Sequence, residues 1–265
     1  MDLAPTPGLI SAAGLFLVGL FLGMLVMLEL GRRVRIRRRE RGEDGETPGL
    51  GVVDAGVFAL LGLLVAFTFS GAATRFDARR HLVIEEANDI GTAYLRLDLL
   101  PADARTQLQE IFRQYLDARL AAYQNVVDQE ATRSAMAKVN DLQRQIWTRA
   151  VQACRRVSTT DAAILLLPAL NAMFDITTTR TAVTQIHPPT IIFALLVIVA
   201  LVCSLLAGYG MAGTDAPRDW VHIVGFAVVL TVTVYVIVDL EYPRLGFIRV
   251  DSFDQLLASL RSSLQ

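Results

Sequence analysis

Residues 58–101 read FALLGLLVAFTFSGAATRFDARRHLVIEEANDIGTAYLRLDLLP, and this stretch decides the fold. It is almost entirely apolar up to Ala73, which is the composition of a helix that crosses a membrane. Beyond that point, apolar residues recur at steps of three and four, as on one face of a helix: Val83, Ala87, Ile90, Tyr94 and Leu97. Pro101 ends the pattern. The sequence therefore predicts a helix that leaves the membrane and enters a helical domain.

Four charged residues of this stretch form the first candidate site: Glu85, Glu86, Asp89 and Arg96. One hypothesis is an ion-attracting vestibule just beyond the span, where an oligomer would bring several copies together. The other is a solvated helix face, on which exposed charge pairs contribute only about 0.2–0.5 kcal/mol. The solvated face is the simpler interpretation, because adjacent acidic residues attract anions poorly unless Arg79, Arg80 and Arg96 compensate.

The composition is that of a membrane protein. Of 265 residues, 53% are hydrophobic, and the mean hydropathy is +0.44. Four segments are long enough to cross roughly 30 Å of hydrocarbon, which takes about 20 apolar residues: 9–30, 52–73, 191–209 and 221–240. The net charge of -1 gives no field that would attract nucleic acid. We therefore expect an all-α membrane protein with four transmembrane helices and a helical domain inserted between the second and third.

The predicted organisation has five parts. They are the first span with an Arg-rich loop (1–50), the second span (51–74), the helical extramembrane domain (75–188), the third and fourth spans (189–240) and a C-terminal amphipathic helix (241–265). Within the domain, helices are expected over 102–127, over 130–157 and from Asp161, the last with an apolar run broken by Pro168. The tail helix is expected to dock on the domain or to lie on the membrane.

Orientation is predicted from the arginines. The loop after the first span, GRRVRIRRRERGEDGE, contains seven of them, whereas the residues before that span include no Lys or Arg. The positive-inside rule places this loop in the cytoplasm. The N-terminus, the C-terminus and residues 75–187 are then predicted to lie outside. Arg75, Arg79 and Arg80 beside the second span favour the opposite orientation but are outnumbered.

Two further sets of residues are candidates. The second span has an uncharged middle, so a pore along it would be hydrophobic or hydroxyl-lined, with Phe58, Gly62, Thr68, Phe69 and Ser70 as possible pore-lining residues. On the last helix of the domain, a structural polar network is expected from Asn171, Asp175 and Arg180, which can pair with the helix that carries Arg96. Close helix packing, within or between subunits, is suggested by small residues: Gly19, Gly23, Gly51, Gly56 and Gly62.

Other chemistry has little support in the sequence. Ionisable residues inside spans are functional candidates because lipid makes them costly, but Glu29, Asp54 and Asp239 all lie near span ends. Neither a disulfide nor a metal site is predicted, because the cysteines and histidines are scattered: Cys154, Cys203, His81, His187 and His222. The sequence contains no Gly-rich phosphate loop, nucleophile elbow or His-based acid–base arrangement, so neither an enzyme nor a cofactor is expected.

Three blocks of the sequence resemble a bacterial family of bestrophin-like membrane proteins. They are the stretch quoted above, LPALNAMFDITTTRTAV (167–183) and DLEYPRLGFIRVD (239–251), and the resemblance covers most of residues 50–255. Bestrophins are oligomeric anion channels with four spans and a helical domain between the second and third, so the resemblance implies this layout and a channel. Because the family is bacterial, it also implies a bacterial inner membrane. The sequence differs from bestrophins in two ways. Their helical domain is cytoplasmic, whereas the arginines here place the domain outside, and this sequence has nothing equivalent to the aromatic constriction of a bestrophin pore.

The sequence therefore favours a homo-oligomeric channel that conducts inorganic ions across the lipid bilayer. One alternative is a non-conducting envelope scaffold or sensor that binds a partner through its helical domain. Another is a proton-motive-force transducer of the flagellar-stator kind, which shares the layout of two spans on each side of a domain. Such a transducer normally needs a proton-handling group deep in a span, and the three carboxylates named above lie near span ends.

Overall fold

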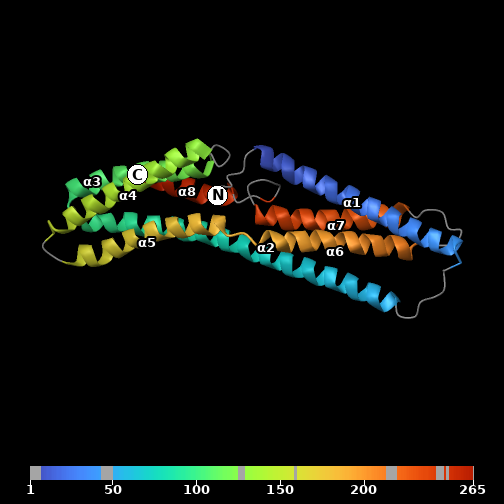
Figure 1. The fold of residues 1–265 in the computed structure, drawn as a ribbon. Helices are drawn as coiled ribbons and strands as arrows, with labels where there is room; N and C mark the ends of the chain where they lie inside the picture. Colours follow the sequence, from blue (N-terminus) through green and yellow to red (C-terminus); the bar gives the residue numbers. More distant parts are fainter. Residues whose placement is uncertain are drawn as a thin grey trace. The chain divides into compact units, whose positions relative to one another are not determined.

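A computed structural model describes residues 7–42, 50–124, 129–157, 160–212, 220–242, 248 and 251–264. Within these residues the secondary structure is helical, without a strand (Figure 1). The elements are α1 (Pro7–Glu40), α2 (Leu50–Leu95), the 3-10 helix η1 (Arg96–Leu99), α3 (Ala102–Gln124), α4 (Gln129–Cys154), α5 (Asp161–Gln185), α6 (Thr190–Gly210), α7 (Trp220–Glu241) and α8 (Asp251–Ser263).

Four helical stretches are long and apolar enough to cross a membrane. They are Gly14–Glu40, Gly51–Leu99, Asp161–Gly210 and Trp220–Glu241, by length and composition. In Gly51–Leu99 the apolar part is residues 52–73, because charged residues follow from Arg75 onward. In Asp161–Gly210 the longest uninterrupted apolar sequence lies in α6, which is therefore the part suited to cross a membrane. The prediction of an all-α membrane protein with four apolar helices is confirmed.

Two helices are long and uninterrupted. α2 is one helix of 46 residues that continues past the end of its apolar part. α5 runs without a break through Pro168, which divides its apolar run in the sequence. A proline inside a helix removes one backbone hydrogen bond and disturbs the preceding turn. Arg96 Nη1 donates to the Leu165 carbonyl oxygen in that turn, at 2.6 Å, and the buried residues on both sides of Pro168 hold the helix in its core.

The chain divides into two compact units. One, called here the helical unit, consists mainly of Phe76–Ile186 and Pro243–Gln265. The other, called the apolar unit, consists of Leu9–Arg75 and His187–Tyr242. α2 contributes residues to both.

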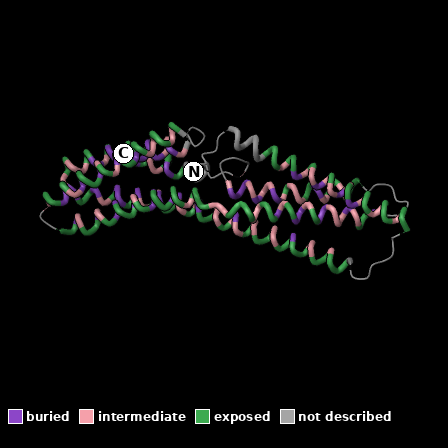
Figure 2. The backbone as a smooth tube through the Cα atoms, in the orientation of Figure 1, coloured by how far each residue is buried: buried purple, intermediate pink, exposed green. Residues whose placement is uncertain are grey.

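The helical unit has a continuous hydrophobic core (Figure 2). α3 supplies Phe112 and Leu116, and the ring of Phe112 lies edge-on to that of Tyr94, with centroids 5.9 Å apart. The tail helix α8 docks on this unit: Leu257 is buried in the core, and Arg261 binds both carboxylate oxygens of Asp117 at 2.8 and 3.1 Å. Docking on the domain is thus the correct one of the two alternatives for the tail.

The apolar unit is built around α6. Its most buried positions recur at helical spacing and are Leu196, Val199, Ala200, Cys203, Ser204 and Gly208. α1 crosses α6 so closely that a Cβ on Gly31 would overlap the Leu205 carbonyl, and one on Gly208 would overlap that of Leu28. Only glycine allows this approach. Of the predicted Gly19-x-x-x-Gly23 pair, Gly23 faces α6 and Gly19 faces open space.

Candidate functional site

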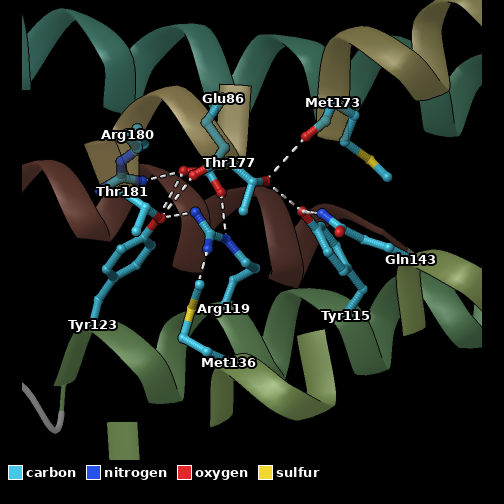
Figure 3. Close-up of polar contacts among 10 residues, drawn as sticks. All are labelled: Glu86, Tyr115, Arg119, Tyr123, Met136, Gln143, Met173, Thr177, Arg180 and Thr181. Carbon is cyan, nitrogen blue, oxygen red and sulfur yellow. Dashed lines mark hydrogen bonds and ion pairs between the residues drawn. The ribbon is translucent and has the colours of Figure 1, made fainter. Parts of the chain in front are cut away.

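A fully buried ion-pair cluster lies at the centre of the helical unit (Figure 3). Glu86 of α2 is 0% exposed, Arg119 of α3 is 1% exposed, and Arg180 of α5 is 7% exposed. Arg119 Nε donates to Glu86 Oε1 at 2.6 Å, and Arg180 Nη1 donates to Glu86 Oε2. One carboxylate therefore binds two guanidinium groups from two other helices.

Each of these charges occupies a core position of its helix. Glu86 follows buried Val83 by three residues and precedes buried Ile90 by four. Arg119 follows buried Leu116 by three residues, and Arg180 follows buried Ile176 by four. Because residues three and four apart share a helix face, the apolar stripes carry these side chains into the interior.

Tyrosine and threonine side chains extend the cluster. Tyr123 donates to Glu86 Oε2 at 3.1 Å, and its ring lies under both guanidinium groups, 4.7 Å from that of Arg119 and 4.0 Å from that of Arg180. Nearby, the hydroxyls of Tyr115 and Thr177 are hydrogen-bonded at 3.0 Å. Gln143 and Met136 of α4 also make contacts, so the cluster joins α2, α3, α4 and α5 (Figure 3).

The electrostatics keep this cluster ionised. Burial raises the pKa of Glu86, but the charges and hydrogen bonds of Arg119 and Arg180 outweigh burial and hold the pKa below its ordinary value. Burial and the Glu86 carboxylate raise the pKa of Tyr123, so its hydroxyl stays protonated. Such a cluster fixes the mutual register of four helices and does not exchange protons near neutral pH.

A second buried carboxylate lies in the apolar unit. Glu241, the last residue of α7, is 0% exposed. Arg75 of α2 donates to its Oε2 at 2.8 Å, and Nδ1 of His187 lies 3.0 Å from its Oε1. The imidazole of His187 stacks on the ring of Tyr242, with centroids 4.7 Å apart.

This second cluster is formed where the chain leaves the apolar unit. The unit ends at Arg75 on α2, resumes at His187 before α6 and ends again at Tyr242 after α7. All three of these terminal residues belong to the cluster around Glu241. The cluster therefore ties together three segments of the apolar unit that are far apart in sequence.

The predicted vestibule residues do not share one environment. Glu85 is exposed and Asp89 half-buried, whereas Glu86 points into the core. Burial and the charges of Glu85 and Glu86 raise the pKa of Asp89. Arg96 is bound to the Leu165 carbonyl. The structure thus separates Glu86 from the face that carries Glu85 and Asp89.

The other predicted groups are also divided. Of the polar network, Arg180 is buried on Glu86, while Asn171 and Asp175 are exposed. The expected pairing of α5 with the helix that carries Arg96 takes two forms. Arg180 of α5 binds Glu86 of α2, and Arg96 of η1 donates to a backbone carbonyl of α5.

The five possible pore-lining residues lie on different sides of α2. Phe58 packs edge-on against Phe226 of α7, with ring centroids 6.3 Å apart. Thr68 is half-buried and bonds to the carbonyls of its own helix. Gly62, Phe69 and Ser70 are exposed.

Sequence reasoning missed most residues of the two clusters, among them Arg119, Tyr123, His187 and Glu241. Of these four, Arg119 alone had a usable signal in the sequence. It follows the core residues Tyr115 and Leu116 by four and three positions, which places it on the buried face of its helix. Among the described residues, no three His, Cys, Asp or Glu side chains could together hold a metal ion, and both cysteines are free and buried.

Comparison with known proteins gives one family. A family model described as a Bestrophin-like domain matches residues 16–252, most of the chain. No curated protein and no solved structure matches.

Proposed function

The chain belongs to the bestrophin-like family, and from that premise we propose that it assembles into a homo-oligomeric ion channel in a bacterial inner membrane. The observation that carries the proposal is the outward face of α2. Of residues 52–73, only Leu61 and Ala72 are buried within the chain. A helix so weakly covered by its own chain offers a whole face to neighbouring copies or to a pore.

The chemistry of that face fits contact with other helices. Gly51, Gly56 and Gly62 of this helix are exposed, and a Cβ at each would meet nothing within 4 Å. Small residues let helices of neighbouring subunits approach closely. Ser70 adds an exposed hydroxyl near the end of the span, where a water-filled path would need polar groups.

Conductance of the purified full-length protein in planar bilayers tests the proposal. In a background with Cys154→Ala and Cys203→Ala, a thiol reagent should change the conductance of Gly62→Cys and Ser70→Cys. Leu61→Cys, whose position is buried, is the matched control and should not respond. Protein that is folded and reconstituted but never conducts would overturn the channel.

The proposed orientation follows the arginines of α1 and is tested separately. A cysteine at exposed Ser134 of α4 should react with an impermeant reagent on intact spheroplasts. A cysteine at exposed Arg37 of α1 should react only after lysis. The reverse result would put the helical unit in the cytoplasm, as in bestrophins.

A scaffold or sensor is the second candidate, and an apolar surface of the helical unit supports it. Leu95 and Leu99 are 70% and 40% exposed, and Ile164 and Leu165 on the adjoining start of α5 are 65% and 44% exposed. Contiguous exposed apolar side chains are typical of protein-binding surfaces. A partner retained by the wild type and lost with Leu95→Ser and Ile164→Ser, in a protein without conductance, would favour this function.

A stator-like transducer has weaker support. Its best groups are Asp239, 4% exposed, and Glu241, but both lie in the last turn of α7. Glu29 pairs with Arg33 at 2.8 Å, also near the end of an apolar run. Proton-driven work would require a titrating group reached from both sides of the membrane.

A further inference from the structure

The helix α1 continues well past its apolar part. The apolar run ends at Leu30, and the helix goes on to Glu40. Its extension and the turn that follows contain Arg32, Arg33, Arg35, Arg37, Arg38, Arg39 and Arg41. The acidic residues between 29 and 42 are Glu29 and Glu40, so this end of the helix is strongly positive.

Four of these arginines fall into two groups. Arg32 and Arg33 lie beside Glu29, at 3.8 and 2.8 Å, which balances part of their charge. Arg35 and Arg38 instead face α6. The guanidinium of Arg35 lies 5.1 Å from the centroid of the Tyr209 ring and donates to the Tyr209 carbonyl at 3.5 Å. Arg38 Nη1 donates to the Tyr209 hydroxyl at 3.4 Å.

This corner lies at the end of two apolar helices. Tyr209 is the last residue but one of α6, and Gly31 packs against Leu205 one turn earlier. Tyrosines at span ends sit at the level of the lipid headgroups. The guanidinium groups of Arg35 and Arg38 are therefore held at the depth of the lipid phosphates.

We propose that Arg35, Arg38 and Tyr209 form a binding site for the phosphate of an anionic phospholipid headgroup. Two guanidinium groups one turn apart can share the oxygens of one phosphate through charge-assisted hydrogen bonds. The Tyr209 hydroxyl, which accepts from Arg38, can donate its own proton to the same group. A headgroup that carries a choline cation presents no net negative charge to this corner and binds less tightly. The site does not depend on conduction.

The test is to titrate full-length protein in neutral detergent with phosphatidylglycerol, following the apparent Tm. Parallel titrations use phosphatidylcholine with the same chains and inorganic phosphate. Phosphatidylglycerol should raise Tm at lower concentrations than phosphatidylcholine. Each arginine near a lipid surface contributes about fivefold in affinity, so Arg35→Gln with Arg38→Gln should weaken binding about 25-fold.

The matched control is Arg133→Gln with Arg144→Gln. These two exposed arginines of α4 each pair with an acidic residue three positions earlier, Glu130 and Asp141. It should bind the lipid as the wild type does. Equal effects of the two lipids, or an unchanged affinity of the Arg35 and Arg38 variant, would overturn the site. An equal effect of inorganic phosphate would overturn the lipid as its ligand.

A measurement on the wild type keeps the proposal testable if that variant fails to fold. Raising the salt from about 0.1 to 1 M shortens the screening length from about 10 to 3 Å, so affinity for phosphatidylglycerol should fall. Salt-independent binding would show that the acyl chains are recognised instead, against the proposal.

Discussion

Glu86 and Glu241 are both fully buried carboxylates, one in each unit, but their charges are balanced differently. Glu86 binds two guanidinium groups, whose side chains are 1% and 8% exposed. Glu241 binds one guanidinium, 29% exposed, and an imidazole, 25% exposed. Arginine remains charged at any physiological pH. The helical unit is thus fixed by permanent charges that are almost fully buried, while the cations of the cluster in the apolar unit stay partly solvated.

The largest effect is expected from breaking the cluster of permanent charges. Arg119→Met should lower the free energy of unfolding by about 3–5 kcal/mol, because it removes one partner of a buried charge. Circular dichroism of the full-length protein in detergent during thermal or urea unfolding measures this.

Arg144→Met is the control for that experiment. Arg144 pairs with Asp141 at 3.0 Å, but both side chains are more than half exposed, so the change should be within about 0.5 kcal/mol. Equal losses in the two variants would mean that burial adds nothing to the Glu86 cluster.

A smaller loss is expected at the second cluster. Glu241→Gln keeps the shape of the side chain but removes the charge that Arg75 and His187 face, which should cost about 1.5–3 kcal/mol. The partly solvated partners can turn to water, unlike those of Glu86. A loss greater than that of Arg119→Met would reverse the ranking of the two clusters.

The Glu86 cluster can also be tested with acid. The pKa of Glu86 is lowered from 4.5 in the folded protein, so its contribution is complete above about pH 4.5 and is lost as the pH falls through the lower, folded value. Each unit of difference is worth about 1.4 kcal/mol. Between pH 6 and 3, Tm should therefore fall more steeply for the wild type than for Glu86→Gln. Parallel curves would contradict a lowered pKa at Glu86.

The sequence predicted helices and spans well because their signals are local. About 20 apolar residues identify a span, and a stripe at steps of three and four identifies a helix face. The same logic assigns a charged residue to the surface, and for Glu86 this is misleading. Its partners lie 33 and 94 positions away, and no local sequence pattern predicts the pairing.

The same limit applies to the apolar unit. Glu241 is separated by 166 residues from Arg75 and by 54 from His187. The close crossing of α1 and α6 was also missed, because Gly31 and Gly208 lie on separate helices, while Gly19 and Gly23 form a recognisable pattern on one. Contacts between distant segments depend on how helices dock, which a local pattern does not contain.

The smallest effect on stability is expected beside Glu86, on the outer face of α2. Glu85→Gln with Asp89→Asn should change the free energy of unfolding by about 0.5 kcal/mol or less, because one side chain is exposed and the other half-buried. Its effect on conduction tests the vestibule. If Glu85 and Asp89 line the mouth of an oligomeric channel, their charge raises the local cation concentration, and salt screens it over about 10 Å at 0.1 M. Selectivity for cations over anions should then fall at low salt and change less at high salt. Unchanged selectivity at every salt concentration would leave these residues as a solvated face, next to a Glu86 whose role is to hold the helices together.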